Sequence, residues 1–220
     1  SRLVMEAVQA DFLGEARGSE TLRDLEEDEI SDKMRSAVRR ANRAVIQRAS
    51  EHPEFQGMGT TMTLAFVRSN RVIIAHVGDS RAYLIDGKEA WINQITDDHS
   101  FVEALLASGH ITSEQAAVHP MRNVLYRALG QVDDTEADLY SRTLAAGDWL
   151  VMCSDGLTRH VKPAEIAEMT SFDTPSQHNR VYCSREHAIH ANAVLRHLQG
   201  HSPSESKYCT FRCCVRRYRL

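Results

Sequence analysis

The sequence lacks a long apolar run, since its unbroken apolar stretches are only a few residues long, so no membrane-spanning helix is predicted. It lacks an excess of positive charge: 26 Lys and Arg face 30 Asp and Glu, and the net charge of −4 does not indicate nucleic-acid binding. No basic stretch followed by an apolar one opens the chain, so we expect a cytoplasmic location rather than secretion. Gly-x-Ser-x-Gly, His-Glu-x-x-His and Walker-type phosphate motifs are also absent.

What is present is typical of one globular domain, with 42% apolar and 25% charged residues among 220. The stretch from His178 to Leu220 differs from the rest. It holds eight basic and two acidic residues, four of the five cysteines and five of the eleven histidines, and it shows no regular apolar period. We therefore predict a domain over residues 1–174 and an atypical basic tail over 175–220. One hypothesis is that a shift of reading frame or a faulty gene model produced this tail.

Cysteine spacing leaves a second hypothesis for the tail. Cys209, Cys213 and Cys214, with nearby histidines, offer zinc ligands, but no second well-spaced pair accompanies them and a zinc finger is not favoured. The fifth cysteine, Cys153, falls within an apolar strand and is interpreted as a small buried side chain.

Apolar spacing predicts four helices and five strands in the domain. The predicted helices cover 3–12, 30–46, 98–115 and 163–169, and the predicted strands cover 60–67, 72–77, 82–85, 88–92 and 149–153. Ser69-Asn70 and Asp86-Gly87 are interpreted as the turns of two hairpins. This order favours an α+β fold, with helices layered on antiparallel sheets.

Two aspartates follow predicted strands, in Gly78-Asp79-Ser80-Arg81 and in Ser154-Asp155-Gly156. A carboxylate at the end of a strand is well placed to hold a hard cation, because the sheet fixes its backbone. The alternative for Asp79 is an ordinary Asp-Ser turn, and the alternative for Asp155 is a helix N-cap. Spacing alone leaves both alternatives open.

Several cationic or titratable side chains are further candidates. His99 is a possible proton carrier, although the acids beside it are explained by capping of the helix that follows. His119, Arg122 and Arg127 are candidates for a small anion site, with a solvated basic face as the preferred alternative. His76 lies in a β-branched strand and is interpreted as a hydrogen-bonded core or edge residue.

The order of these motifs resembles that of the metal-dependent protein phosphatase family, type 2C or PPM, and specifically its bacterial serine/threonine phosphatases. The resemblance covers about residues 1–174. The motifs that carry it are, in order, Gly57-Met58-Gly59-Thr60-Thr61, Val77-Gly78-Asp79-Ser80-Arg81-Ala82-Tyr83, Thr96-Asp97-Asp98-His99-Ser100, His119-Pro120 with Arg122, Arg127-Ala128-Leu129-Gly130, Gly147-Asp148 and Cys153-Ser154-Asp155-Gly156-Leu157.

The resemblance implies a four-layer α-β-β-α sandwich of two antiparallel sheets flanked by helix pairs, with metals in a cleft at one end. It implies hydrolysis of phosphoserine and phosphothreonine in proteins phosphorylated by a serine/threonine kinase, through water bridging two Mn²⁺ or Mg²⁺ ions. By motif, Asp155 is a ligand of the binuclear centre and Asp79 a ligand of a possible third metal. The segment from His99 to about Arg127, with His119 and Arg122, is the flap on the substrate side.

The sequence departs from the family where most metal ligands are expected. The Asn-Glu-Asp and Asp-Gly-Met-Gly-Gly motifs do not occur, and no Asp lies between Thr174 and Leu220 to supply the late Asp-Asn pair. We therefore expect a domain truncated at both ends, with unpaired sheet edges and little or no activity. The alternative function is a non-catalytic scaffold that binds phosphoproteins.

Overall fold

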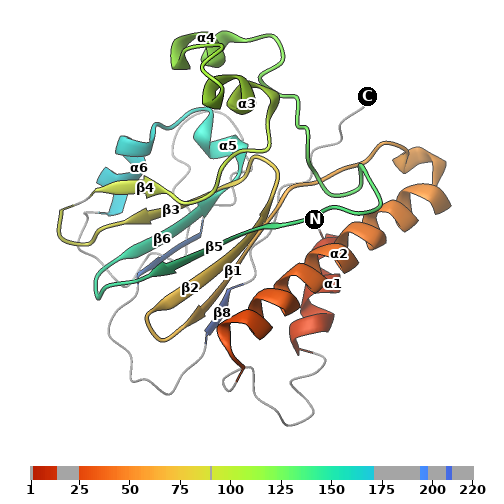
Figure 1. The fold of residues 1–220 in the computed structure, drawn as a ribbon, viewed down its shortest axis with the longest axis horizontal. Helices are drawn as coiled ribbons and strands as arrows, with labels where there is room; N and C mark the ends of the chain where they lie inside the picture. The colour runs from red at the N-terminus through yellow and green to blue at the C-terminus, as the bar shows by residue number, and fades with distance from the viewer. Residues whose placement is uncertain (1, 14–24, 90, 171–193, 198–206, 210–220) are drawn as a thin grey trace.

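The computed structural model describes residues 2–13, 25–89, 91–170, 194–197 and 207–209, and these residues form two antiparallel sheets of four strands each (Figure 1). The first sheet has the order β5-β2-β1-β8, with bounds Asp138–Thr143, Arg71–Val77, Met62–Arg68 and Lys207–Cys209. The second has the order β4-β3-β6-β7, with bounds Ile92–Gln94, Arg81–Ile85, Trp149–Cys153 and Val194–His197.

Two helices, α1 (Arg2–Leu13) and α2 (Glu27–Glu51), cover the outer face of the first sheet (Figure 1). Their apolar residues recur every three or four positions, so one face of each helix is buried against the sheet. Val8 and Val38 pack in one cluster with Phe66 and Ile73 of the sheet. The first turn of α2 is acidic, which favours the positive end of the helix dipole.

The space between the sheets is filled by the opposite faces of the same strands. Val72 and Ile74 of β2 pack in one cluster with Ala82, Leu150 and Met152 of the second sheet. Successive residues of a strand point to opposite faces, so β2 is buried on both sides. Its continuous β-branched run follows from this double burial.

Helix α6 (Pro163–Thr170) completes the fourth layer on the outer face of the second sheet. Ile166 and Ala167 pack against Tyr83, Val151 and Cys153. The predicted α+β class and the α-β-β-α arrangement of two antiparallel sheets are therefore confirmed. The prediction of a buried Cys153 is confirmed as well.

The predicted two-residue hairpin at Asp86-Gly87 is wrong. Strand β4 begins only at Ile92, which pairs with Ile85, and the Asp86 amide donates to the Trp91 carbonyl at 2.8 Å. The Asp86 carboxylate accepts hydrogen bonds from the Lys88 and Glu89 amides at 2.7 and 2.8 Å, which favours a wider turn.

The predicted helix over 98–115 is two helices, α3 (Phe101–Ala107) and α4 (Ser113–Val118). Gly109, at φ +73°, lies between them, and the Thr112 hydroxyl caps α4 by accepting a hydrogen bond from the Gln115 amide. Both helices lie beyond one end of the sheets (Figure 1). Among the described helices, none is both long and apolar enough to span a bilayer.

The expectation of unpaired sheet edges is corrected by two short strands from the tail. Strand β8 pairs with the stretch from Ala65 to Val67 of β1, and β7 pairs with the stretch from Trp149 to Met152 of β6. Most of the predicted tail, including Cys213 and Cys214 of the zinc hypothesis, lies outside the described residues.

Candidate active site at the end of the two sheets

Asp79 and Asp155 come from different parts of the chain but share one register. Asp79 lies two residues before β3, and Asp155 lies two residues after β6 and begins the short helix α5 (Asp155–Thr158). The β3–β6 ladder ends with Arg81 opposite Cys153. Both aspartates therefore lie two residues beyond this last pair, at the same end of the two strands. Strand pairing therefore brings the two predicted metal ligands to the same end of the fold.

Electrostatic coupling is consistent with this proximity. Burial and, after it, the charges of Asp155 and Asp98 together raise the pKa of Asp79 to about 6, against the opposing effect of Arg159. The Arg159 guanidinium lies 2.8 Å from Asp155 Oδ2, one turn further along the chain. Neighbouring carboxylates that repel one another attract a cation or a proton, so this end of the molecule favours binding of positive charge.

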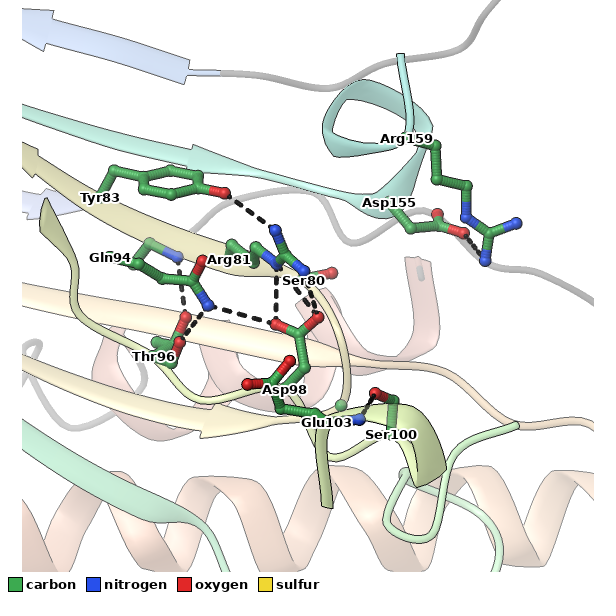
Figure 2. Close-up of polar contacts among 12 residues, drawn as sticks. Ser80, Arg81, Tyr83, Gln94, Thr96, Asp98, Ser100, Glu103, Asp155 and Arg159 are labelled. Atoms are coloured by element: carbon green, nitrogen blue, oxygen red, sulfur yellow. Dashed lines mark hydrogen bonds and ion pairs between the residues drawn. The ribbon is translucent and has the colours of Figure 1, made fainter. Parts of the chain in front are cut away.

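A third carboxylate, Asp98, is already neutralised by Arg81 (Figure 2). The Arg81 Nε and Nη2 atoms lie 2.9 and 2.8 Å from the Asp98 carboxylate, and the Tyr83 hydroxyl accepts a further bond from Arg81 at 3.3 Å. The Gln94 amide bridges the Thr96 carbonyl and Asp98 Oδ1 at 2.7 and 3.4 Å. This fork-to-fork geometry makes Asp98 a partner of Arg81, and the interpretation of Asp98 as a helix-capping acid is wrong. Ser100 caps α3 instead.

His99 does not lie on the substrate side of the flap as predicted, because its side chain is buried with only 1% of the residue exposed. Two backbone hydrogen bonds join the two ends of the flap. The Tyr126 amide donates to the His99 carbonyl at 3.0 Å, and the Phe101 amide donates to the Val124 carbonyl at 2.9 Å. Residues 101–124 therefore form a loop closed at its base, with α3 and α4 inside it.

The other candidates of the flap do not form the anion site considered from the sequence. Arg122 is exposed, and His119 is half-buried at the end of α4, where its Nδ1 accepts from the Met121 amide at 3.1 Å. Arg127 instead pairs with Asp138 at 2.6 Å. A guanidinium already bound to a carboxylate is a poor anion receptor, so the structure separates Arg127 from the other two.

The described side chains provide only part of the ligand set that a binuclear metal centre needs. Within the described part of the chain, no group of three or more His, Cys, Asp or Glu side chains is arranged to hold a metal ion. Asp79 and Asp155 supply two carboxylates, which with water fit one hard divalent cation. They do not supply the ligands of a binuclear centre.

Sequence reasoning missed three contributors: Asp138, Arg159 and the pairing of Arg81 with Asp98. The spacing of four residues between Asp155 and Arg159 is a local signal that was available, because such residues are neighbours on a helix. Asp138 gives no local signal, because its contact with His99 spans 39 residues.

The chain is similar to known phosphatases over this same region. The sequence model described as "Protein phosphatase 2C" matches residues 7–104. The serine/threonine phosphatase stp of Listeria monocytogenes is 38% identical over 150 residues, which are 68% of this chain and 59% of that protein. The PstP phosphatase of Mycobacterium tuberculosis is 40% identical over 136 residues, 62% of this chain and 26% of that protein. This chain thus spans about three fifths or less of these curated relatives.

Solved structures extend the similarity to the fold. The serine/threonine phosphatase of S. agalactiae matches with a TM-score of 0.69 and 32% identity, over 78% of this chain and 69% of that one. Stp1 from Staphylococcus aureus matches with a TM-score of 0.67 and 37% identity, over 77% and 65%. A PstP catalytic domain solved with two manganese ions matches with a TM-score of 0.61 and 32% identity, over 76% of this chain and 66% of that one. This chain belongs to the protein phosphatase 2C, or PPM, family.

Proposed function

We propose that this chain is part of a metal-dependent phosphatase that hydrolyses phosphoserine and phosphothreonine in proteins phosphorylated by a serine/threonine kinase. The observation that carries the proposal is that the β3–β6 ladder ends two residues from both Asp79 and Asp155, whose charges repel each other. The names of the relatives support the substrate class, since they are serine/threonine phosphatases. The manganese ions in one related structure support Mn²⁺ or Mg²⁺ as the cofactor.

In this proposal the residues of this chain bind the cation, neutralise a carboxylate and attract the phosphate. Asp79 and Asp155 hold one divalent cation, while Arg81 keeps Asp98 neutralised. A divalent cation in such a site supplies activation of water and neutralisation of the phosphoryl oxygens. Arg122, exposed on the flap, meets the phosphorylated segment as it approaches, because a guanidinium attracts phosphate.

In this proposal we expect turnover by this 220-residue chain to be weak. The described residues bring two carboxylates to the site and no larger group of metal-ligating side chains. Hydrolysis that depends on two ions needs ligands for both, so the second ion is weakly held. The proposed phosphatase part comprises residues 1–174, and the basic tail comprises residues 175–220.

A manganese-dependent assay on a phosphothreonine peptide tests the proposal, with binding of Mn²⁺ followed by calorimetry. We expect Mn²⁺-dependent turnover, however slow, that Asp155→Asn abolishes together with Mn²⁺ binding. Asp134→Asn is the matched control, because it removes an exposed carboxylate from a surface loop.

Two results would contradict the proposal. Turnover that is equal in wild type and Asp155→Asn removes the aspartate from the reaction. Binding of the phosphopeptide without any turnover at saturating Mn²⁺ favours the alternative function, a non-catalytic scaffold for phosphoproteins.

A further inference from the structure

Two buried histidines bind the peptide groups of Gly78, the residue that precedes Asp79. The Gly78 amide donates to His99 Nδ1 at 3.1 Å, and the His99 amide donates to the Gly78 carbonyl at 2.8 Å. His76 Nε2 lies 2.9 Å from the same carbonyl. Both backbone groups of Gly78 are therefore satisfied by these two residues, whose rings lie 5.0 Å apart.

These partners determine the tautomer of each ring. A carbonyl only accepts, so His76 carries its proton on Nε2, and its Nδ1 accepts from the Thr63 hydroxyl at 3.0 Å. An amide only donates, so His99 Nδ1 is unprotonated and His99 Nε2 carries the proton, which it donates to Asp138 Oδ2 at 2.9 Å. Every ring nitrogen of the pair has a defined donor or acceptor role.

Charge supports this assignment. Burial and, to a smaller extent, the neighbouring His99 lower the pKa of His76 to about 3. Burial also lowers the pKa of His99, against the effect of Asp138. For Asp138, burial opposes ionisation, but hydrogen bonds from His99 and Arg127 outweigh it and lower the pKa. Near neutral pH both rings are uncharged and Asp138 is an anion.

Asp138 joins this group to the far end of the flap. Arg127 follows the flap in the chain, and its Nη1 donates to Asp138 Oδ1 at 2.6 Å. His99 begins the flap and occupies the other carboxylate oxygen. One carboxylate on β5 thus holds the residues on both sides of the flap.

The backbone at Gly78 is one that suits glycine alone. Gly78 has φ +114°, and a Cβ atom there would lie 2.3 Å from the Thr61 side chain. Glycine takes this conformation without strain, and the hydrogen bonds to the two histidines select it among the conformations open to glycine. The direction in which the chain leaves Gly78 sets the position of Asp79.

We propose that His99 is a positioning residue that fixes the Gly78-Asp79 turn and, through Asp138, both ends of the flap as one unit. The catalytic consequence rests on the proposed function: the position of Asp79 relative to the flap stays the same while substrate binds. The structural claim does not depend on phosphatase activity, because all of its contacts lie within this chain.

Amide hydrogen exchange measured by NMR on the metal-free chain tests this claim. His99→Gln retains a terminal amide able to donate to Asp138 but removes the acceptor facing Gly78, whereas His99→Asn retains an acceptor near Gly78 and loses the bond to Asp138. We expect His99→Gln to speed exchange of the Gly78 amide by about tenfold or more, and His99→Asn to speed exchange of the Tyr126 amide by a similar factor.

Controls separate positioning from general destabilisation. His110→Gln makes the same substitution on the exposed part of the flap, and we expect it to leave the Gly78 and Tyr126 amides unchanged. Amides in the middle of α2 report global unfolding, and we expect both His99 variants to leave their exchange within about twofold of wild type. Asp138→Asn should resemble His99→Asn.

Two outcomes would overturn the proposal. Unchanged exchange of Gly78 and Tyr126 in both His99 variants means that the ring does not hold the turn or the flap. Equal acceleration at Gly78, at Tyr126 and in α2 means that His99 contributes only to global stability. Neither outcome depends on turnover, so a failure of this proposal is distinguishable from a failure of the proposed function.

Discussion

Substitution of Asp79 by Asn should stabilise the metal-free protein, although Asp79 is a candidate ligand. The pKa of Asp79 is about 6 in the folded protein, against an ordinary value of 3.8, because burial and the charges of Asp155 and Asp98 oppose ionisation. Since a tenfold change in proton affinity corresponds to about 1.4 kcal/mol, the charged form costs up to about 3 kcal/mol. Asn keeps the shape of the side chain and removes this cost.

The effect has a defined dependence on pH. A carboxyl with a raised folded pKa binds its proton more tightly in the folded state, so its destabilising effect is absent below about pH 4 and complete above about pH 6. Wild-type stability should therefore fall relative to Asp79→Asn as the pH rises from 4 to 6. At pH 7.5 in EDTA we expect the variant to be more stable by about 1–3 kcal/mol.

Urea denaturation at pH 4, 5, 6 and 7.5 measures this difference, with Asp134→Asn as the control for loss of an exposed carboxylate. Mn²⁺ at about a thousand times Kd should then reverse the order, since the ion stabilises only the chain that binds it, by about 4 kcal/mol at that concentration. If Asp79→Asn is no more stable than wild type in EDTA at pH 7.5, the repulsion inferred at this site is refuted.

Three further substitutions test neighbouring contacts. Arg81→Met should lower the free energy of unfolding by about 2–4 kcal/mol in urea denaturation, because it leaves Asp98 buried and unpaired, and Asp98→Asn in the same chain should recover part of the loss. Arg159→Gln should cost under about 1 kcal/mol and should tighten Mn²⁺ binding several-fold in calorimetry, since it frees one oxygen of Asp155 from a cation. Gly78→Ala should cost about 2–4 kcal/mol through its positive φ and the contact with Thr61, and a loss below about 1 kcal/mol would contradict that contact.

Periodicity predicted most of the elements because each has its own apolar face. Helix α2 buries one stripe, and β2 is apolar from Val72 to Ala75 because it is covered on both sides. The hairpin at Asp86 failed for a local reason, since the side chain of Asp86 binds two following amides and widens the turn. A dipeptide signal does not include that competition between side chain and backbone.

The candidate site was predictable only in part. Asp79 and Asp155 follow recognisable strands, and their pairing needs no more than the β3–β6 register. The role of His99 was not predictable, because it depends on Gly78 and Asp138, which lie 21 and 39 residues away. The local sequence shows only that His99 precedes a helix. The burial of its ring depends on the packing of β2 and β5, which are distant in the sequence.

The charges at this end of the fold explain why the pKa of Asp79 is raised. Asp79 lies near two further carboxylates, those of Asp98 and Asp155. Arg81 pairs with Asp98 through two nitrogens and Arg159 pairs with Asp155, so of these three charges that of Asp79 is in excess. In the metal-free protein that excess is relieved by a proton on Asp79 as the pH falls toward 6. A divalent cation and this proton therefore compete for the same carboxylate, and Mn²⁺ affinity should fall as the pH drops below about 6.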